Sequence, residues 1–215
     1  MTVWWITLFS TYFLCLFARM SGKYKYVKGE RVFRANALFA GMACAVLIFV
    51  SGFRQGIGDT GTYRDLFEKV PASFFGFLTH PTIKTDSGFY AIVAFIKQCI
   101  SSDSQKVLLC MAIVTIGLIF ITYYKNTDMI EMAVFLFITS GCYLVTMNGV
   151  RQYLASAILF FCFPMIYKRQ WKFYLPIVLL CSTIHQSALI FLLLYFVVDP
   201  VSYTHLRAHE TLRHL

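Results

Sequence analysis

Four ionisable residues lie in or beside apolar stretches of membrane length, namely Arg54, Asp59, Arg151 and His185. An ionisable side chain inside a membrane is costly and usually belongs to a functional site. An arginine can hold phosphate or diphosphate through paired hydrogen bonds, whereas a carboxylate or a histidine can accept the proton of a hydroxyl group. Together these residue types indicate chemistry on a substrate that carries phosphate and hydroxyl groups.

The string SGFRQGIGDTGTY holds Arg54, Asp59 and Tyr63. Its glycines would let the backbone approach a phosphate group that the Arg54 guanidinium grips. The alternative is structural: Arg54 extends its side chain to the lipid headgroups, and Asp59 caps the helix that follows. Spacing alone leaves both interpretations open.

The string MNGVRQ stands between two apolar segments, with Arg151 at the start of the second. Arg151 could form an ion pair with Asp59 or Asp86, or it could bind an anionic substrate at a helix N-terminus. We favour substrate binding because charge within the membrane usually marks a site. The candidate substrate-binding residues are Arg54, Tyr63, Asn148, Arg151 and Gln152.

His185 stands in STIHQSAL, where hydroxyl and amide side chains interrupt an apolar segment. It is either a general acid or base or a buried histidine that bonds to a neighbouring helix. Asp86, in DSGFY, is either a base toward a sugar hydroxyl or a helix N-cap. The candidate catalytic residues are Asp59, Asp86 and His185. The seven cysteines lack metal-site spacing and are expected to pack as small apolar residues, so neither a metal nor a cofactor is expected.

The composition predicts an all-α, polytopic integral membrane protein and excludes a soluble domain. The 215 residues are 59% hydrophobic and 13% charged, with a mean hydropathy of +0.67. The formal net charge is +9. Its basic residues gather in KYKYVKGERVFR and KRQWK at the ends of apolar runs, which is typical of cytoplasmic anchors rather than of nucleic-acid binding.

Six crossings and one short re-entrant or interfacial helix, at 88–100, account for the apolar segments and for the charge pattern. In this topology the basic clusters and Lys125 face the cytoplasm, and residues 54–104 form an outer region. The candidate residues then gather at the outer face. The six predicted crossings are residues 1–20, 36–53, 105–124, 131–147, 153–167 and 173–198.

After Asp199 the sequence becomes polar and rich in histidine. The string VSYTHLRAHET resembles translated sequencing-adapter read-through. We therefore expect residues 1–199 to be part of a transmembrane domain and residues 200–215 to be a non-native tail. The spacing of His205 and His209 fits a helical metal pair, but in such a tail it would have no function. A basic tail at the membrane surface is the alternative.

Four motifs in order resemble the EpsG family of Wzy-like exopolysaccharide polymerases. They are R-x-G-x-G-D-x-x-x-Y from Arg54 to Tyr63, an acidic residue before G-F, N-G-x-R-Q at a helix start, and H-Q-S-A-L late in a helix. The resemblance runs from about residue 40 to 198. The chain departs from it in reading Gly58-Asp59-Thr60 where many members read G-T-D, and in having Asp86 where glutamate is common. Family members are also longer.

The resemblance implies a multi-pass protein of the bacterial inner membrane that transfers a growing glycan between undecaprenyl-diphosphate-linked repeat units at the outer face. Arg54 and Arg151 would hold the diphosphate, Asp59 or Asp86 would orient or deprotonate the acceptor hydroxyl, and His185 would assist. The implied partners are the lipid-linked oligosaccharide, the bilayer, and flippase and chain-length regulator proteins. No nucleic acid is implied.

Two other functions fit the composition. A transporter of lipid-linked oligosaccharides would have inverted repeats and charged groups near the membrane midplane, and neither is found in the sequence. A membrane acyltransferase would use His185 as a base, typically with an acidic residue a few positions away, and the nearest acidic residue along the chain is Asp199.

Overall fold

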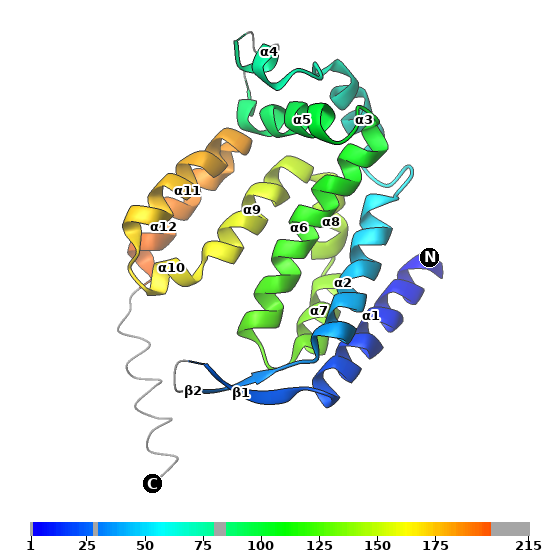
Figure 1. Ribbon diagram of the computed structural model, residues 1–215, viewed down its shortest axis with the longest axis vertical. Helices are drawn as coiled ribbons and strands as arrows, with labels where there is room; N and C mark the ends of the chain where they lie inside the picture. The colour runs from blue at the N-terminus through cyan, green and yellow to red at the C-terminus, as the bar shows by residue number, and fades with distance from the viewer. Residues whose placement is uncertain (1, 28–29, 80–84, 199–215) are drawn as a thin grey trace.

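The computed structural model describes residues 2–27, 30–79 and 85–198, and most of them are helical (Figure 1). Helix α2 packs between α1 and α6, and α6 packs in turn against α9. Small buried residues such as Cys15 of α1 and Ala43 of α2 let the first two helices approach closely. These four helices are α1 (Thr2–Met20), α2 (Ala37–Gly52), α6 (Ser104–Asn126) and α9 (Val150–Cys162).

Three helices in the described residues are long and apolar enough to cross a membrane, rather than the six predicted. They are Thr2–Met20, Ser104–Asn126 and Val150–Tyr167, the last of which joins α9 to α10 (Pro164–Tyr167). A fourth crossing is possible if a bent pair of helices, α7 and α8, counts as one span. Helix α2 is apolar but has only 16 residues.

The bend between α7 (Ile130–Thr139) and α8 (Cys142–Asn148) is 57°. Gly141 lies between the two helices with a φ of +81°, a left-handed conformation that glycine adopts without steric cost. The segment 131–147 was predicted as one continuous helix. The glycine within its apolar run is the physical reason for the break.

Residues 173–198 form a helical hairpin, so the single crossing predicted there was wrong. Helix α11 (Trp171–Ile184) ends at His185, whose backbone is extended (φ −157°, ψ 127°). The polar side chains around His185 allow this interruption because they compete for backbone hydrogen bonds. The short 3₁₀ helix η1 (Gln186–Leu189) and α12 (Ile190–Val197) follow.

Helix α12 returns beside α11 (Figure 1). The rings of Tyr174 and Tyr195 stack with their centroids 5.8 Å apart, whereas in one continuous helix these two residues would lie about 30 Å apart. The Tyr174 hydroxyl donates to the Phe191 carbonyl at 3.2 Å. Arg169 donates to the carbonyls of Tyr195 and Val198, which holds the end of α12 near the start of α11.

Three short helices form a layer at one end of the bundle, which we call the α5 end. They are α3 (Thr60–Lys69), α4 (Phe74–Thr79) and α5 (Ser87–Cys99), and α5 lies across the ends of the long helices (Figure 1). The segment 88–100, predicted as a short re-entrant or interfacial helix, is thus a short helix that lies across the bundle. Lys97, the charge within this apolar segment, donates to the Phe67 and Val70 carbonyls at 3.0 and 2.6 Å and so caps the end of α3.

The opposite end, which we call the basic end, carries an antiparallel pair of strands that the all-α prediction missed. Strands β1 (Lys23–Val27) and β2 (Glu30–Arg34) form a hairpin within the first basic cluster. Arg34 donates to the carbonyl of Lys125 at 2.8 Å. KRQWK lies at the same end, beside α10 (Figure 1). The three basic segments therefore share one end, as the charge pattern predicts.

Candidate functional site

Asp86 is the centre of a group of ionisable side chains at the α5 end. Its Oδ2 lies 2.7 Å from Arg151 Nη1 and 3.8 Å from His185 Nδ1. The first distance is a charge-assisted hydrogen bond; the second is too long for a hydrogen bond but within range of an ion pair when the imidazole is protonated. The Asp86 side chain is 11% exposed and that of Arg151 is 32% exposed, so the group is open on the arginine side.

The backbone of Asp86 is left-handed, with φ 53° and ψ 37°. This conformation costs an L-amino acid roughly 1–2 kcal/mol, although aspartate tolerates it better than most residues. Asp86 occupies the N-cap position of α5, yet its side chain makes no capping hydrogen bond and turns to Arg151 instead. It is therefore not a simple helix cap, and Arg151 pairs with Asp86 rather than with Asp59.

A glycine brings the elements of this group together. Gly88, in the first turn of α5, lies so close to Thr183 of α11 that a β-carbon added at position 88 would overlap the Thr183 hydroxyl. The same β-carbon would lie only 3.0 Å from the Thr183 carbonyl carbon. Because no side chain intervenes, α5 touches the end of α11, and Asp86 comes within reach of His185.

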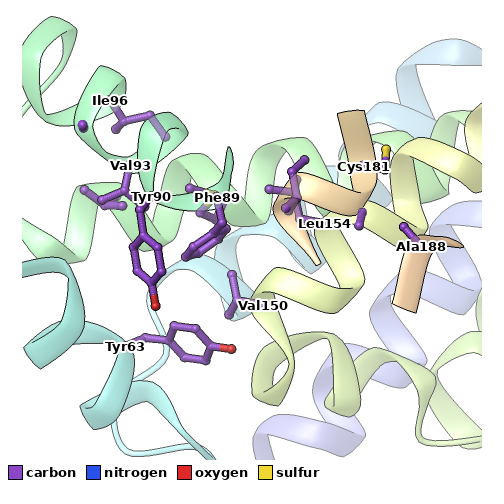
Figure 2. Packing of buried hydrophobic residues seen from close by; sticks show 14 of the residues in the cluster. Tyr63, Phe89, Tyr90, Val93, Ile96, Val150, Leu154, Cys181 and Ala188 are labelled. Carbon is purple, nitrogen blue, oxygen red and sulfur yellow. The ribbon is translucent and has the colours of Figure 1, made fainter. Parts of the chain in front are cut away.

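Two tyrosines line the same group. Tyr63 of α3 is buried, and its hydroxyl lies beside the Arg151 side chain. Tyr90 of α5 is buried beside it, and Figure 2 shows both rings packed near Val150 at the start of α9. Burial raises the pKa of the Tyr90 phenol, partly opposed by the nearby Arg151, so Tyr90 is neutral at physiological pH.

Arg54 is only 5% exposed and points into the protein. It donates to Thr60 Oγ1 at 3.1 Å, to the Ser51 carbonyl at 2.7 Å and to the Met147 carbonyl at 3.1 Å. Arg54 therefore ties the end of α2 to the start of α3 and to the end of α8. It does not extend toward lipid headgroups, and it forms neither a hydrogen bond nor an ion pair with Asp86.

Asn148 lies against the glycine-rich string. Gly58 has a φ of +54°, and a β-carbon added there would overlap the Asn148 amide oxygen. That oxygen is buried and has no hydrogen-bond partner among the described residues. Asn148, three residues before Arg151, thus packs against the backbone of the glycine-rich string and leaves this buried acceptor unpaired among the described residues.

The two remaining candidates lie apart from the group. Asp59 is exposed, and its side chain makes no capping hydrogen bond, although its carbonyl accepts from Tyr63 N. Gln152 is exposed on α9. The structure thus brings together Asp86, Arg151, His185 and Tyr63, leaves Asp59 and Gln152 at the surface, and uses Arg54 within the fold.

Sequence reasoning did not single out Gly88, Tyr90 or Thr183. All three stand in strings that it did select, DSGFY and STIHQSAL. Their positions next to Asp86 and His185 in sequence were therefore the feature that could have identified them. Among the described residues, no group of three or more histidine, cysteine or acidic side chains could hold a metal ion. The seven cysteines are all free, and Cys15, Cys162 and Cys181 are buried.

Comparison with protein families gives one result for this chain. The model of the EpsG family matches residues 37–206, which include every residue of the group around Asp86 and extend past Asp199. No curated protein and no solved structure matches the chain.

Proposed function

Because the chain belongs to the EpsG family, whose membership indicates a role in exopolysaccharide biosynthesis, we propose that it is a polysaccharide polymerase. The substrate would be an oligosaccharide linked to undecaprenyl diphosphate, and the product a glycan longer by one repeat unit. The observation that carries the proposal is the position of Asp86 between Arg151 and His185, at 2.7 and 3.8 Å. The three side chains come from separate elements that meet at the α5 end.

In the proposed reaction a hydroxyl oxygen of the acceptor repeat unit attacks the anomeric carbon of the growing glycan. The new glycosidic bond forms as the bond from that carbon to the diphosphate oxygen breaks, and the lipid diphosphate leaves with the electron pair. The acceptor proton passes to Asp86 Oδ2 or, with Asp86 orienting it, to His185. A positioned base of this kind contributes about 10²–10⁴-fold to the rate.

Arg151 is the arginine we assign to the diphosphate. Its side chain is 32% exposed and stands near the N-terminus of α9, where backbone N–H groups also favour an anion. Arg54 is buried, and three of its five N–H donors are used by one hydroxyl and two carbonyl groups of the protein. We therefore assign Arg54 a positioning role. It holds the end of α8, where Asn148 is the last residue, and Arg151 follows at the start of α9.

The outer face of the bacterial inner membrane is the proposed location of the site. The protein has several apolar helices long enough to span a membrane. KRQWK and the basic β-hairpin lie at the end opposite to Asp86, and basic segments are retained on the cytoplasmic side. The α5 end would then face outward. Flippase and chain-length regulator proteins are the proposed partners in the membrane.

One observation also fits acyl transfer. Among the described residues, Asp86 is the acidic residue that lies beside His185, at 3.8 Å, although the two are 99 positions apart in the sequence. A carboxylate that orients an imidazole is what an acyltransferase base requires. The pair of Arg151 with the same oxygen favours glycosyl transfer, since an acyl group brings no diphosphate for the arginine to bind.

The test is an Asp86→Asn variant in cells that supply the lipid-linked repeat unit, with Asp65→Asn on the exposed face of α3 as the matched control. Chain length is read on gels, and lipid-linked single repeats are measured by mass spectrometry. Loss of long chains with accumulation of single repeats on the outer face supports the polymerase. Accumulation on the inner face indicates a transporter, and normal chains lacking an acyl group indicate an acyltransferase.

A further inference from the structure

A cavity of about 490 Å³ lies at the basic end, far from Asp86. It opens between the last turn of α6 and the junction of α9 with α10. Helix α6 reaches the α5 end at Gln105, which donates to the Gly52 carbonyl, and it reaches the cavity at Thr122. These positions are 17 helical residues apart, or about 25 Å. The cavity is lined by Thr122, Tyr123, Asn126, Thr127, Phe160, Phe163, Pro164, Tyr167 and Lys168.

The lining has an apolar wall and a polar rim. Tyr123, Phe160 and Phe163 provide rings, and the Tyr123 and Phe160 rings contact each other at 5.7 Å between centroids. Asn126 and Lys168, both exposed, provide an amide and an ammonium group at the ends of their helices. Aromatic rings beside a lysine at the end of a spanning helix are typical of the membrane interface.

The charge around the cavity favours an anion. Lys168 lines the cavity, and Lys125 adjoins the lining in sequence, with its ammonium 5.1 Å from the centre of the Phe161 ring. Asp128 is the acidic residue next to the lining in sequence, and it is exposed. Glu131 is buried and paired with Arg19 at 3.0 Å, so its charge is compensated. Two cations, Lys125 and Lys168, therefore stand against one uncompensated carboxylate.

We propose that this cavity is a binding site for an anionic phospholipid from the leaflet at the basic end. The phosphate would lie between Lys168 and Asn126, and the first acyl carbons would pack on Phe160 and Phe163. The volume is in the range of ligand-binding pockets and suits a headgroup with the first part of its chains. This site is separate from the proposed polymerase site and takes a different ligand.

The test measures lipid binding to the purified full chain in nanodiscs by native mass spectrometry, with phosphatidylglycerol titrated into phosphatidylcholine. Any lysine near an anionic membrane surface strengthens the attraction of the protein to that surface about fivefold. The test therefore compares a lysine that lines the cavity with a lysine that lies at the same end outside it. Lys168→Gln removes the ammonium at the cavity. Lys172→Gln removes a nearby ammonium that does not line it. Asn126→Trp keeps the charge and fills the cavity from an exposed position.

We expect Lys172→Gln to weaken retention of one phosphatidylglycerol molecule by no more than about fivefold, the contribution of any surface lysine, and Lys168→Gln to weaken it clearly more. Asn126→Trp, which leaves the charge unchanged, should weaken retention at least fivefold. Equal losses in Lys168→Gln and Lys172→Gln, or retention in Asn126→Trp, would overturn the site. Inorganic phosphate alone should not displace the lipid, because it lacks chains for the aromatic wall. Displacement by phosphate at equal concentration would also overturn the proposal.

Discussion

Gly88 at the start of α5 rests directly on Thr183 at the end of α11, with no room for a side chain between them. The contact joins the layer at the α5 end to the first helix of the hairpin. It also explains how Asp86 and His185, distant in sequence, come within 3.8 Å of each other. The geometry of the candidate site therefore depends on a residue that carries no functional group.

Replacing Gly88 by alanine should disrupt the site. The added methyl group would overlap Thr183 and push α5 away, at a cost of about 1–3 kcal/mol in folding free energy. We expect a lower temperature of unfolding in detergent and the loss of long glycan chains. Gly61→Ala is the control, because a β-carbon there meets nothing within 4 Å. An active Gly88→Ala variant would show that this contact does not set the position of Asp86.

Removing the charge of Asp86 should lower the polymerisation rate more than removing the charge of Asp59. Asp86 is nearly buried between Arg151 and His185, whereas Asp59 is exposed without a side-chain capping bond. We expect Asp86→Asn to lower the polymerisation rate by about 10²-fold or more and Asp59→Asn to lower it less than tenfold. Initial rates of chain extension in membrane vesicles would measure both. The reverse order would identify Asp59 as the base.

Substitution of Arg54 should lower stability, whereas substitution of Arg151 should lower activity. Arg54→Lys leaves at least one of the three buried acceptors without its donor, because lysine cannot reproduce the planar guanidinium. Each lost bond to a charged group costs about 1–3 kcal/mol, so we expect a clear fall in unfolding temperature. Arg151→Lys, at a partly exposed position, should unfold near the normal temperature and yet lose long-chain product.

Thermal unfolding and chain length, measured on the same preparations, check this pair of variants. Arg151→Lys keeps a positive charge beside Asp86, so any loss of product reflects the bidentate geometry that a diphosphate requires. If Arg54→Lys unfolds normally but makes no polymer, Arg54 acts on the substrate after all. If Arg151→Lys makes normal chains, Arg151 serves only as a partner of Asp86.

The hairpin formed by residues 171–197 predicts that its two ends lie on the same side of the membrane. Cysteines introduced at Lys172 and Val198 should react with a membrane-impermeant maleimide from the same side, because Arg169 bonds the Tyr195 and Val198 carbonyls. A continuous helix from 173 to 198 would place them on opposite sides. Labelling of right-side-out and inverted vesicles, in a background with the native cysteines replaced, distinguishes these two topologies.

The sequence by itself determined the class of protein, the family and the strings that hold the site. Apolar length and basic clusters predict membrane helices with a shared basic end, because hydropathy and charge act through composition and need no knowledge of packing. An ion pair of Arg151 with Asp59 or Asp86 was one of the two alternatives that residue types alone suggested, although substrate binding was favoured. The EpsG family match over residues 37–206 confirms the resemblance that the motifs indicate.

Tertiary structure decided what the apolar pattern could not. A run such as 173–198 is equally hydrophobic as one helix or as a hairpin, and contacts between its two arms, such as the stacking of Tyr174 on Tyr195, distinguish them. Likewise, Arg54 and Arg151 follow similar glycine-containing strings, but one is enclosed by carbonyls of α2 and α8 while the other remains open beside Asp86. Burial and pairing are properties of neighbours distant in the chain, so they appear only once the helices are assembled.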